Sequence, residues 1–256
     1  MATGPSPAIF TEWVAALEAR HLANLRVPEL TRALRALSST YVERRGAGVR
    51  GALDSAGKRA AFALFYAPLH FLTALHIVQA LDADAPPPRR IVDLGCGTGA
   101  AGAAWAVAAG GAPAITGLDR HPWAVAEANW TYGELGVRGR ARTGNVAQLP
   151  PLTAGTAVVA AFVLNELPAP MRERLEARLV EATARGIRFL IIEPIARGVS
   201  PWWNDAAARV EATGGRADEW RVGVDLPPLL DLLDRSAGLD HRVLTARTLY
   251  CPGRAG

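Results

Sequence analysis

From Arg90 onward, short apolar runs alternate with longer segments in which apolar residues recur at helical spacing. The short runs predict β-strands, and the segments between them predict α-helices. We expect strands at residues 90–94, 114–118, 140–144, 157–163 and 187–192, and helices at about 98–109, 122–136 and 169–185. After Ser200 the pattern predicts helices at 201–212 and 227–236 and a closing strand at 242–250.

This alternation is typical of an α/β fold, in which helices cover both faces of a doubly wound, mostly parallel sheet. Right-handed crossovers bring the carboxyl ends of the parallel strands to one edge of such a sheet, where ligands bind. The loops that follow the strands are therefore the candidate functional site.

The first part of the chain has a different pattern and is predicted to be helical. An amphipathic run starts at Phe10, a second helix starts at Pro28, and a third helical stretch covers residues 53–81. The proline-rich segment 85–89 forms a stiff linker into the first strand. We expect residues 1–88 to form a helical cap that binds substrate, and residues 89–256 to form the α/β domain.

Residues 60–81 contain no Asp, Glu, Lys or Arg, and their length is that of a membrane-spanning helix. The segment nevertheless contains Pro68, His70, His76 and Gln79. We interpret it as a buried helix that is broken at Pro68, and we expect no membrane association.

The most informative motif lies at the end of the first predicted strand. Asp93 is followed by a loop with Gly95, Cys96, Gly97 and Gly99, and the next segment is rich in alanine. Glycines allow positive φ and let a ligand approach the backbone, and the helix that follows offers unpaired N–H groups. The motif predicts a small-ligand platform; the alternative is a tight turn that binds nothing.

The order Asp-x-Gly-x-Gly-x-Gly resembles motif I of the class I S-adenosylmethionine (SAM) methyltransferases, which implies a seven-stranded, Rossmann-like sheet. The resemblance implies that the loop wraps the amino-acid end of SAM and that Asp93 helps to hold the cofactor amino group. Asp119, with Arg120 beside it, ends the second strand, where an acid would meet the ribose hydroxyls. The alternative for Asp119 is a helix N-cap.

Two further strand ends carry polar residues. After the third strand, the resemblance implies that Asn145 meets the adenine amino group and that Val146 lies beside the ring; the alternative for Asn145 is a turn residue. After the fourth strand, the resemblance implies that Asn165 and Glu166 face the methyl group and that Asn165 also contacts the cofactor.

The catalytic candidates are Asn165, Glu166 and Glu193. Asn165 can orient a nucleophile, and Glu166 can act as its base; alternatively, Asn165 caps a turn and Glu166 is solvated. Glu193 ends the buried fifth strand, where burial would raise its pKa toward that of a base; alternatively, it only hydrogen-bonds the loop. Tyr66, His70 and Trp202 are candidate substrate-binding residues, although each is also a candidate core residue.

Composition limits the possible functions. The 256-residue chain has a net charge of +4, and its many arginines are dispersed, so an anionic partner is permitted but not required. Its two cysteines, Cys96 and Cys251, indicate neither a metal site nor a disulfide framework. The N-terminal residues lack the features of a signal peptide, so we expect a cytoplasmic protein.

A narrower resemblance covers residues 90–200. The segment 163–168, the arginine-rich helix after it and the segment 192–194 resemble the methyltransferase-like proteins of the mitochondrial small ribosomal subunit and their bacterial relatives. Those proteins carry extra cysteines for an iron–sulfur cluster, which this chain lacks, so no cluster is expected.

The apolar cap, which contains aromatic residues, favours SAM-dependent methyl transfer to a small molecule. The alternatives are an RNA (rRNA) methyltransferase and a non-catalytic ribosome-assembly factor with this fold.

Overall fold

The computed structural model describes residues 7–23, 25–43, 53–196 and 200–253. Within these residues, a seven-stranded sheet has the order β3-β2-β1-β4-β5-β7-β6. The first five strands pair in parallel, and β7 is antiparallel to both β5 and β6. The strands are β1 (Arg90–Leu94), β2 (Ala114–Asp119), β3 (Gly139–Thr143), β4 (Thr156–Ala161), β5 (Arg188–Glu193), β6 (Arg216–Gly223) and β7 (Val243–Cys251). The predicted doubly wound, mostly parallel sheet is confirmed.

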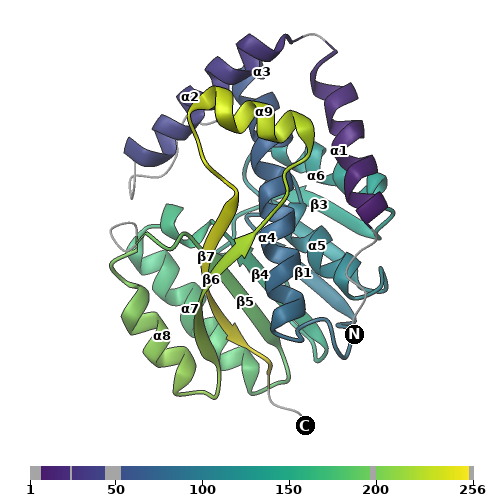
Figure 1. Cartoon of the computed structure of the whole chain (residues 1–256). Helices are drawn as coiled ribbons and strands as arrows, with labels where there is room; N and C mark the ends of the chain where they lie inside the picture. The colour runs from purple at the N-terminus through teal and green to yellow at the C-terminus, as the bar shows by residue number, and fades with distance from the viewer. Residues whose placement is uncertain (1–6, 24, 44–52, 197–199, 254–256) are drawn as a thin grey trace.

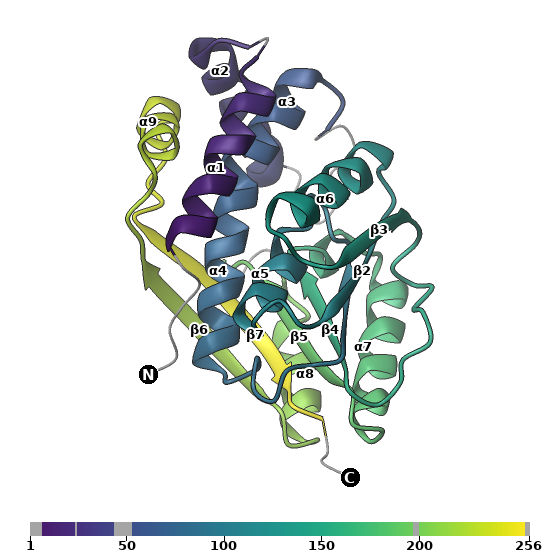
Figure 2. The ribbon, with the colours of Figure 1, turned by 90° about the vertical axis from the view of Figure 1, so that its right-hand side faces the viewer.

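Helices cover both faces of this sheet. On one face lie α4 (Ala67–Ala80), α5 (Ala100–Ala108) and α6 (Pro122–Glu134), and on the other lie α7 (Ala169–Thr183) and α8 (Trp203–Glu211) (Figures 1 and 2). Alternate strand residues supply the two cores: Ile91 packs in the cluster with α4 and α5, whereas Val92 packs in the cluster with α7 and α8. This division follows from the period of two in a strand that is buried on both faces.

The cap above the carboxyl edge of the sheet is built from both ends of the chain. The N-terminal part contributes α1 (Pro7–His21), α2 (Val27–Glu43), α3 (Ala56–Ala61) and the π-helix η1 (Phe62–Tyr66). The C-terminal part contributes α9 (Pro228–Ala237), which packs against α2 although the two are far apart in sequence (Figure 1). The cap is therefore not confined to residues 1–88.

The predicted break at Pro68 is wrong. Helices α3, η1 and α4 follow one another without interruption, and Pro68 lies in the first turn of α4. Proline lacks an N–H donor, and the wider π-helical turn before it accommodates that loss. By length and composition Ala56–Ala80 could cross a membrane, but 72% of its most apolar window is buried, as in the core helix of a folded domain.

Two strand predictions also need correction. The strand expected at 157–163 ends at Ala161, because Phe162 has a φ of 57° and cannot continue the extended backbone. Strand β6 was not expected at all. It lies at the edge of the sheet, and its sequence is rich in charged residues, as is common for edge strands.

Candidate active site

A cavity of about 1100 Å³ lies where the loops after β1, β2, β3, β4 and β5 meet the cap. Typical small-ligand pockets occupy roughly 300–1,000 Å³. The space is therefore sufficient for a cofactor together with a second small molecule. The strand-end loops therefore line a cavity at the edge of the sheet where the sequence predicts the site.

The glycine loop forms one side of this cavity. Gly95 has a φ of +64°, and a Cβ on it would lie 2.3 Å from Cγ2 of Val163, so a larger residue is excluded by both conformation and space. The amide of Gly97 donates to Oδ2 of Asp119 over 2.9 Å. The loop is thus fixed by the neighbouring strand end, and its residues 95–98 line the cavity.

Asp93 lies beneath this loop and is almost fully buried. Its Oδ2 accepts a hydrogen bond from the amide of Gly102, in the first turn of α5, over 3.0 Å. A Cβ at Gly102 would lie only 2.6 Å from that oxygen, so the glycine makes room for the carboxylate. Burial raises the pKa of Asp93 to about 7.

Asp119 joins the glycine loop to the start of α6. Besides accepting from Gly97, it accepts from the amide of His121 over 2.8 Å. The N-cap of α6 is His121, so the alternative that Asp119 is the N-cap is wrong. Each carboxylate oxygen has two lone pairs, so it can still accept from a ligand diol. The exposed Arg120 pairs with Glu166 at 3.6 Å and links the loops after β2 and β4.

The other predicted cofactor residues line the same cavity. Asn145 is exposed, and its Oδ1 accepts from the amide of Ala147, which is the turn predicted as the alternative. Val146 is buried beside it. The thiol of Cys96 is buried, and burial raises its pKa well above the ordinary value, so it is not a thiolate nucleophile.

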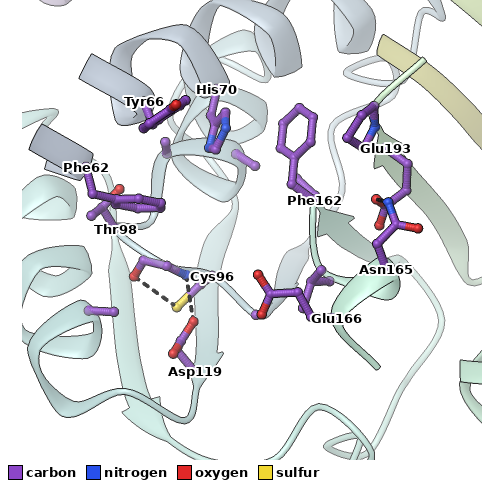
Figure 3. Close-up of a pocket in the computed structure, with 18 of the residues that line it drawn as sticks. Phe62, Tyr66, His70, Cys96, Thr98, Asp119, Phe162, Asn165, Glu166 and Glu193 are labelled. Atoms are coloured by element: carbon purple, nitrogen blue, oxygen red, sulfur yellow. Dashed lines mark hydrogen bonds between the residues drawn. The ribbon is translucent and has the colours of Figure 1, made fainter. Parts of the chain in front are cut away.

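Asn165 is the centre of a polar network at the far end of the cavity (Figure 3). Its Oδ1 accepts from Oγ of Ser200 at 2.5 Å and from Nε1 of Trp202 at 3.2 Å, and its Nδ2 donates to Oε2 of Glu193. Because an indole N–H can only donate, Trp202 fixes the orientation of the Asn165 amide. That orientation requires Glu193 to act as an acceptor.

Glu193 is fully buried and also accepts from the amide of Leu164 over 2.8 Å. Burial raises its pKa to about 8, and the two hydrogen bonds it accepts oppose that shift. Burial also raises the pKa of Glu166, against the opposing effect of Arg120. Both acids line the cavity, so the structure brings together all three predicted catalytic candidates.

Four rings that line the cavity form what we call the aromatic wall: Phe62, Tyr66, His70 and Phe162 (Figure 3). The rings of His70 and Phe162 stack with centroids 4.3 Å apart, and Phe62 and Tyr66 each lie 6.1 Å from His70. Burial lowers the pKa of His70 to about 4, so the imidazole is neutral near pH 7. The strained φ of Phe162 places its ring here, a feature that recurs at functional sites.

Two of the predicted substrate residues, Tyr66 and His70, therefore lie on the cavity wall, whereas Trp202 does not. Trp202 instead donates to Asn165, and its ring lies under the guanidinium of Arg172 at 4.8 Å. Its adjacent neighbour, Trp203, is the first residue of α8 and is buried, with the guanidinium of Arg247 from β7 over its ring at 4.2 Å. The structure thus makes Trp202 a residue that orients Asn165.

Three features of the cavity were not predicted from the sequence: the rings of Phe62 and Phe162, and the pair formed by Asp234 and His241. Nδ1 of His241 lies 2.6 Å from Oδ1 of Asp234, and His241 lines the cavity. A histidine just before a predicted strand, seven residues after an acid in a predicted helix, was the available signal. Over the described parts of the chain, no cluster of His, Cys, Asp and Glu could hold a metal ion.

A family model described as a methyltransferase domain matches residues 91–186, which run from β1 to the end of α7. A search of curated proteins finds no match to this chain.

Solved structures share the fold. Mitomycin 7-O-methyltransferase is 17% identical with a TM-score of 0.54, and the match covers 96% of this chain and 75% of that one. A putative O-methyltransferase from Nostoc punctiforme PCC 73102 is 13% identical with a TM-score of 0.51, covering 88% and 70%. These matches do not confirm the narrower resemblance to the methyltransferase-like proteins of the ribosome.

Proposed function

We propose that this chain is a SAM-dependent methyltransferase, as the match of residues 91–186 to a methyltransferase domain supports, and that it methylates a small, largely apolar molecule held against the aromatic wall. The observation that carries the proposal is the cavity itself. One side is a glycine loop with an acid at each neighbouring strand end, and the other side is aromatic.

The first side fits the cofactor. Gly95 and Gly97 line the cavity, and Asp119 offers carboxylate lone pairs at the end of β2. In the proposed arrangement Asp119 holds the ribose hydroxyls, Asp93 lies below the amino-acid end, and Asn145 lies at the adenine. SAM supplies an activated methyl group on a cationic sulfur.

The chain's own residues then position the acceptor and exclude water. Methyl transfer is an in-line displacement, so the orientation of the acceptor atom dominates the rate. The aromatic wall gives an acceptor a flat apolar surface, and ring–ring contacts favour planar molecules. Asn165 is held rigidly by Glu193 and Trp202, so its amide is a fixed polar group beside the acceptor.

The charge of the cavity also favours a small molecule over RNA. Among the described lining residues, Arg120 is the only arginine or lysine, and it is paired with Glu166. RNA recognition depends on many contacts from Lys and Arg to phosphates, and these make binding strongly salt-dependent. The mitomycin enzyme, which shares the fold, is named for a small-molecule acceptor, and this agrees with the proposal.

The test uses SAM with a labelled methyl group and a cell extract divided into small-molecule, RNA and protein fractions. We expect label in the small-molecule fraction, and loss of that label with Phe162→Ala. Trp130→Ala, which removes an aromatic ring outside the cavity, should leave it unchanged. Label that enters RNA and disappears at high salt would contradict the proposal, and SAM binding without transfer to any fraction would favour an assembly factor.

A further inference from the structure

A carboxylate–imidazole pair lies in the connection between α9 and β7, outside the matched methyltransferase domain. Nδ1 of His241 lies 2.6 Å from Oδ1 of Asp234, and the amide of His241 donates to Oδ2 of the same residue over 2.9 Å. The side chain of Asp234 is 4% exposed, whereas that of His241 is 30% exposed. The acid is thus buried behind an imidazole that reaches open space.

The turn that follows α9 brings His241 next to Asp234. Helix α9 ends at Ala237 and is capped by Gly238, which has a φ of +75°, and the amide of Leu239 donates back to the carbonyl of Asp234 over 2.9 Å. This left-handed C-cap reverses the chain within the last helical turn. His241 is thereby returned to Asp234 and held by two hydrogen bonds.

The open space that His241 reaches is the acceptor side of the cavity. His241 lines the cavity, and its ring meets the ring of Phe65 edge-to-face with centroids 5.3 Å apart. Phe65 packs in turn against Tyr66 of the aromatic wall, with centroids 5.4 Å apart. His241 is also close enough to His70 to affect its ionisation.

The contact with Asp234 decides which nitrogen of His241 is basic. A carboxylate accepts, so in the neutral ring Nδ1 carries the hydrogen and Nε2 carries the lone pair. A buried acid behind Nδ1 also stabilises the imidazolium that forms when Nε2 takes a proton. The pair therefore has the construction of a general base.

We propose that His241 is the general base for a hydroxyl acceptor of the phenol class and that Asp234 positions it. The inference rests on the proposed function, because it assigns the acceptor chemistry of that same site. Nε2 of His241 takes the hydroxyl proton while the oxygen forms a bond to the methyl carbon. The bond from that carbon to sulfur breaks, its electron pair stays on sulfur, and the products are the methyl ether, S-adenosylhomocysteine and imidazolium.

The other ionisable groups of the cavity are less suited to this step. His70 is stacked on Phe162, and its low pKa makes it a weak base. Glu166 is paired with Arg120, and Glu193 already accepts from two donors in a buried network. A hydroxyl is the acceptor that needs such a base, because a neutral amine attacks with its own lone pair.

The charged and titratable groups around His241 come from several elements: Asp234 of α9, His70 of α4, Tyr66 of η1, and Asp240 and Arg242 beside it in the chain. Asp240 and Arg242 form an ion pair with each other. Asp234 is therefore the charge in direct contact with the imidazole.

The experiment uses two probes of the same shape, 4-nitrophenol and 4-nitroaniline, with the full chain. The main variant is His241→Asn, because an asparagine amide can still donate to Asp234 as Nδ1 does, whereas Nε2 is lost. Asp231→Asn, an exposed acid on the same helix, is the matched control. Calorimetric titration of SAM into each protein is made first, and circular dichroism confirms that each is folded.

With SAM, we expect the wild type to methylate 4-nitrophenol in preference to 4-nitroaniline, and kcat to fall by roughly 10²-fold or more in His241→Asn with SAM affinity unchanged. With S-adenosylhomocysteine, the wild type should increase the yellow anion of bound 4-nitrophenol, and the variant should not. Asp234→Asn should change the pH profile of kcat, whereas Asp231→Asn should match the wild type.

A purely structural role for the pair predicts that His241→Asn keeps full activity, and that result would overturn the inference. Transfer to 4-nitroaniline alone, or binding of SAM with no binding of 4-nitrophenol, would overturn the hydroxyl assignment and leave the proposed function standing. A wild-type chain that does not bind SAM would instead refute the proposed function itself.

Discussion

Gly102→Ala tests whether Asp93 is seated where the structure places it. Gly102 lies in α5 with ordinary helical geometry, so alanine introduces no backbone strain there. The new Cβ would lie 2.6 Å from Oδ2 of Asp93 and 3.1 Å from its Cβ and Cγ. The carboxylate must move, and its hydrogen bond from the amide of residue 102 must break.

Two effects of opposite sign set the magnitude. Replacing glycine by alanine within a helix stabilises by roughly 0.5–1 kcal/mol. Overpacking costs about 1–3 kcal/mol, and loss of the hydrogen bond adds about 1 kcal/mol. We therefore expect Gly102→Ala to lower the free energy of unfolding by about 1–3 kcal/mol. Gly133→Ala in α6 is the matched control, because nothing lies within 4 Å of its new Cβ, and it should raise the free energy of unfolding by up to about 1 kcal/mol.

Urea unfolding of the two variants measures this difference, and the double variant Asp93→Ala/Gly102→Ala isolates its cause. With the carboxylate removed, the added methyl group should cost much less, which gives a coupling energy of about 1–2 kcal/mol. SAM affinity should fall in Gly102→Ala and not in Gly133→Ala. If Gly102→Ala were as stable as Gly133→Ala, the position of Asp93 against Gly102 of α5 would be refuted.

Three further predictions concern the rest of the cavity. Because burial raises the pKa of Glu193 from its ordinary value of 4.5 to about 8, the folded chain holds that proton more tightly than the unfolded chain does. This contribution to stability is complete below about pH 4.5 and is lost as the pH rises toward 8, so urea unfolding should show declining stability across that window. Glu193→Gln should remove most of this dependence of stability on pH. At pH 5 it should also lower the free energy of unfolding by about 1–3 kcal/mol, because the new amide group faces the donating amide of Asn165. A dependence on pH equal to that of the wild type would contradict this. Phe162→Gly should be about 1 kcal/mol more stable than Phe162→Ala, since only glycine adopts a φ of 57° without strain, and equal melting temperatures would contradict it.

The sheet and most helices could be predicted because their signals are local. A strand buried on both faces reads as an apolar run, and the residues 90–94 were predicted with the bounds that the structure has. The glycine loop after Asp93 could be interpreted because positive φ and close approach each demand glycine. Strand β6 could not be predicted, since an edge strand with charged residues lacks both an apolar run and clean alternation.

The candidate site was predicted more completely on the cofactor side than on the acceptor side, where Tyr66 and His70 were predicted but Phe62, Phe162 and His241 were not. The cofactor side lies on successive strand ends, so topology brings its residues together. The aromatic wall joins η1 and α4 to the end of β4, and the Asp234–His241 pair comes from the far end of the chain. Such contacts depend on how the cap packs, and no short-range pattern encodes that packing. Trp202 was misplaced for the same reason, because its partner Asn165 lies on another loop.

The central claim is that the glycine loop and Asp119 hold SAM, and calorimetric titration tests it most directly. SAM would be titrated into the wild type, into Asp119→Asn and into Asp205→Asn, an exposed acid on α8 that serves as the control. We expect micromolar binding to the wild type, about −8 kcal/mol, and to the control. Affinity should fall roughly ten-fold in Asp119→Asn, because charge-assisted hydrogen bonds are lost. No binding to the wild type, or equal binding to Asp119→Asn, would contradict the claim.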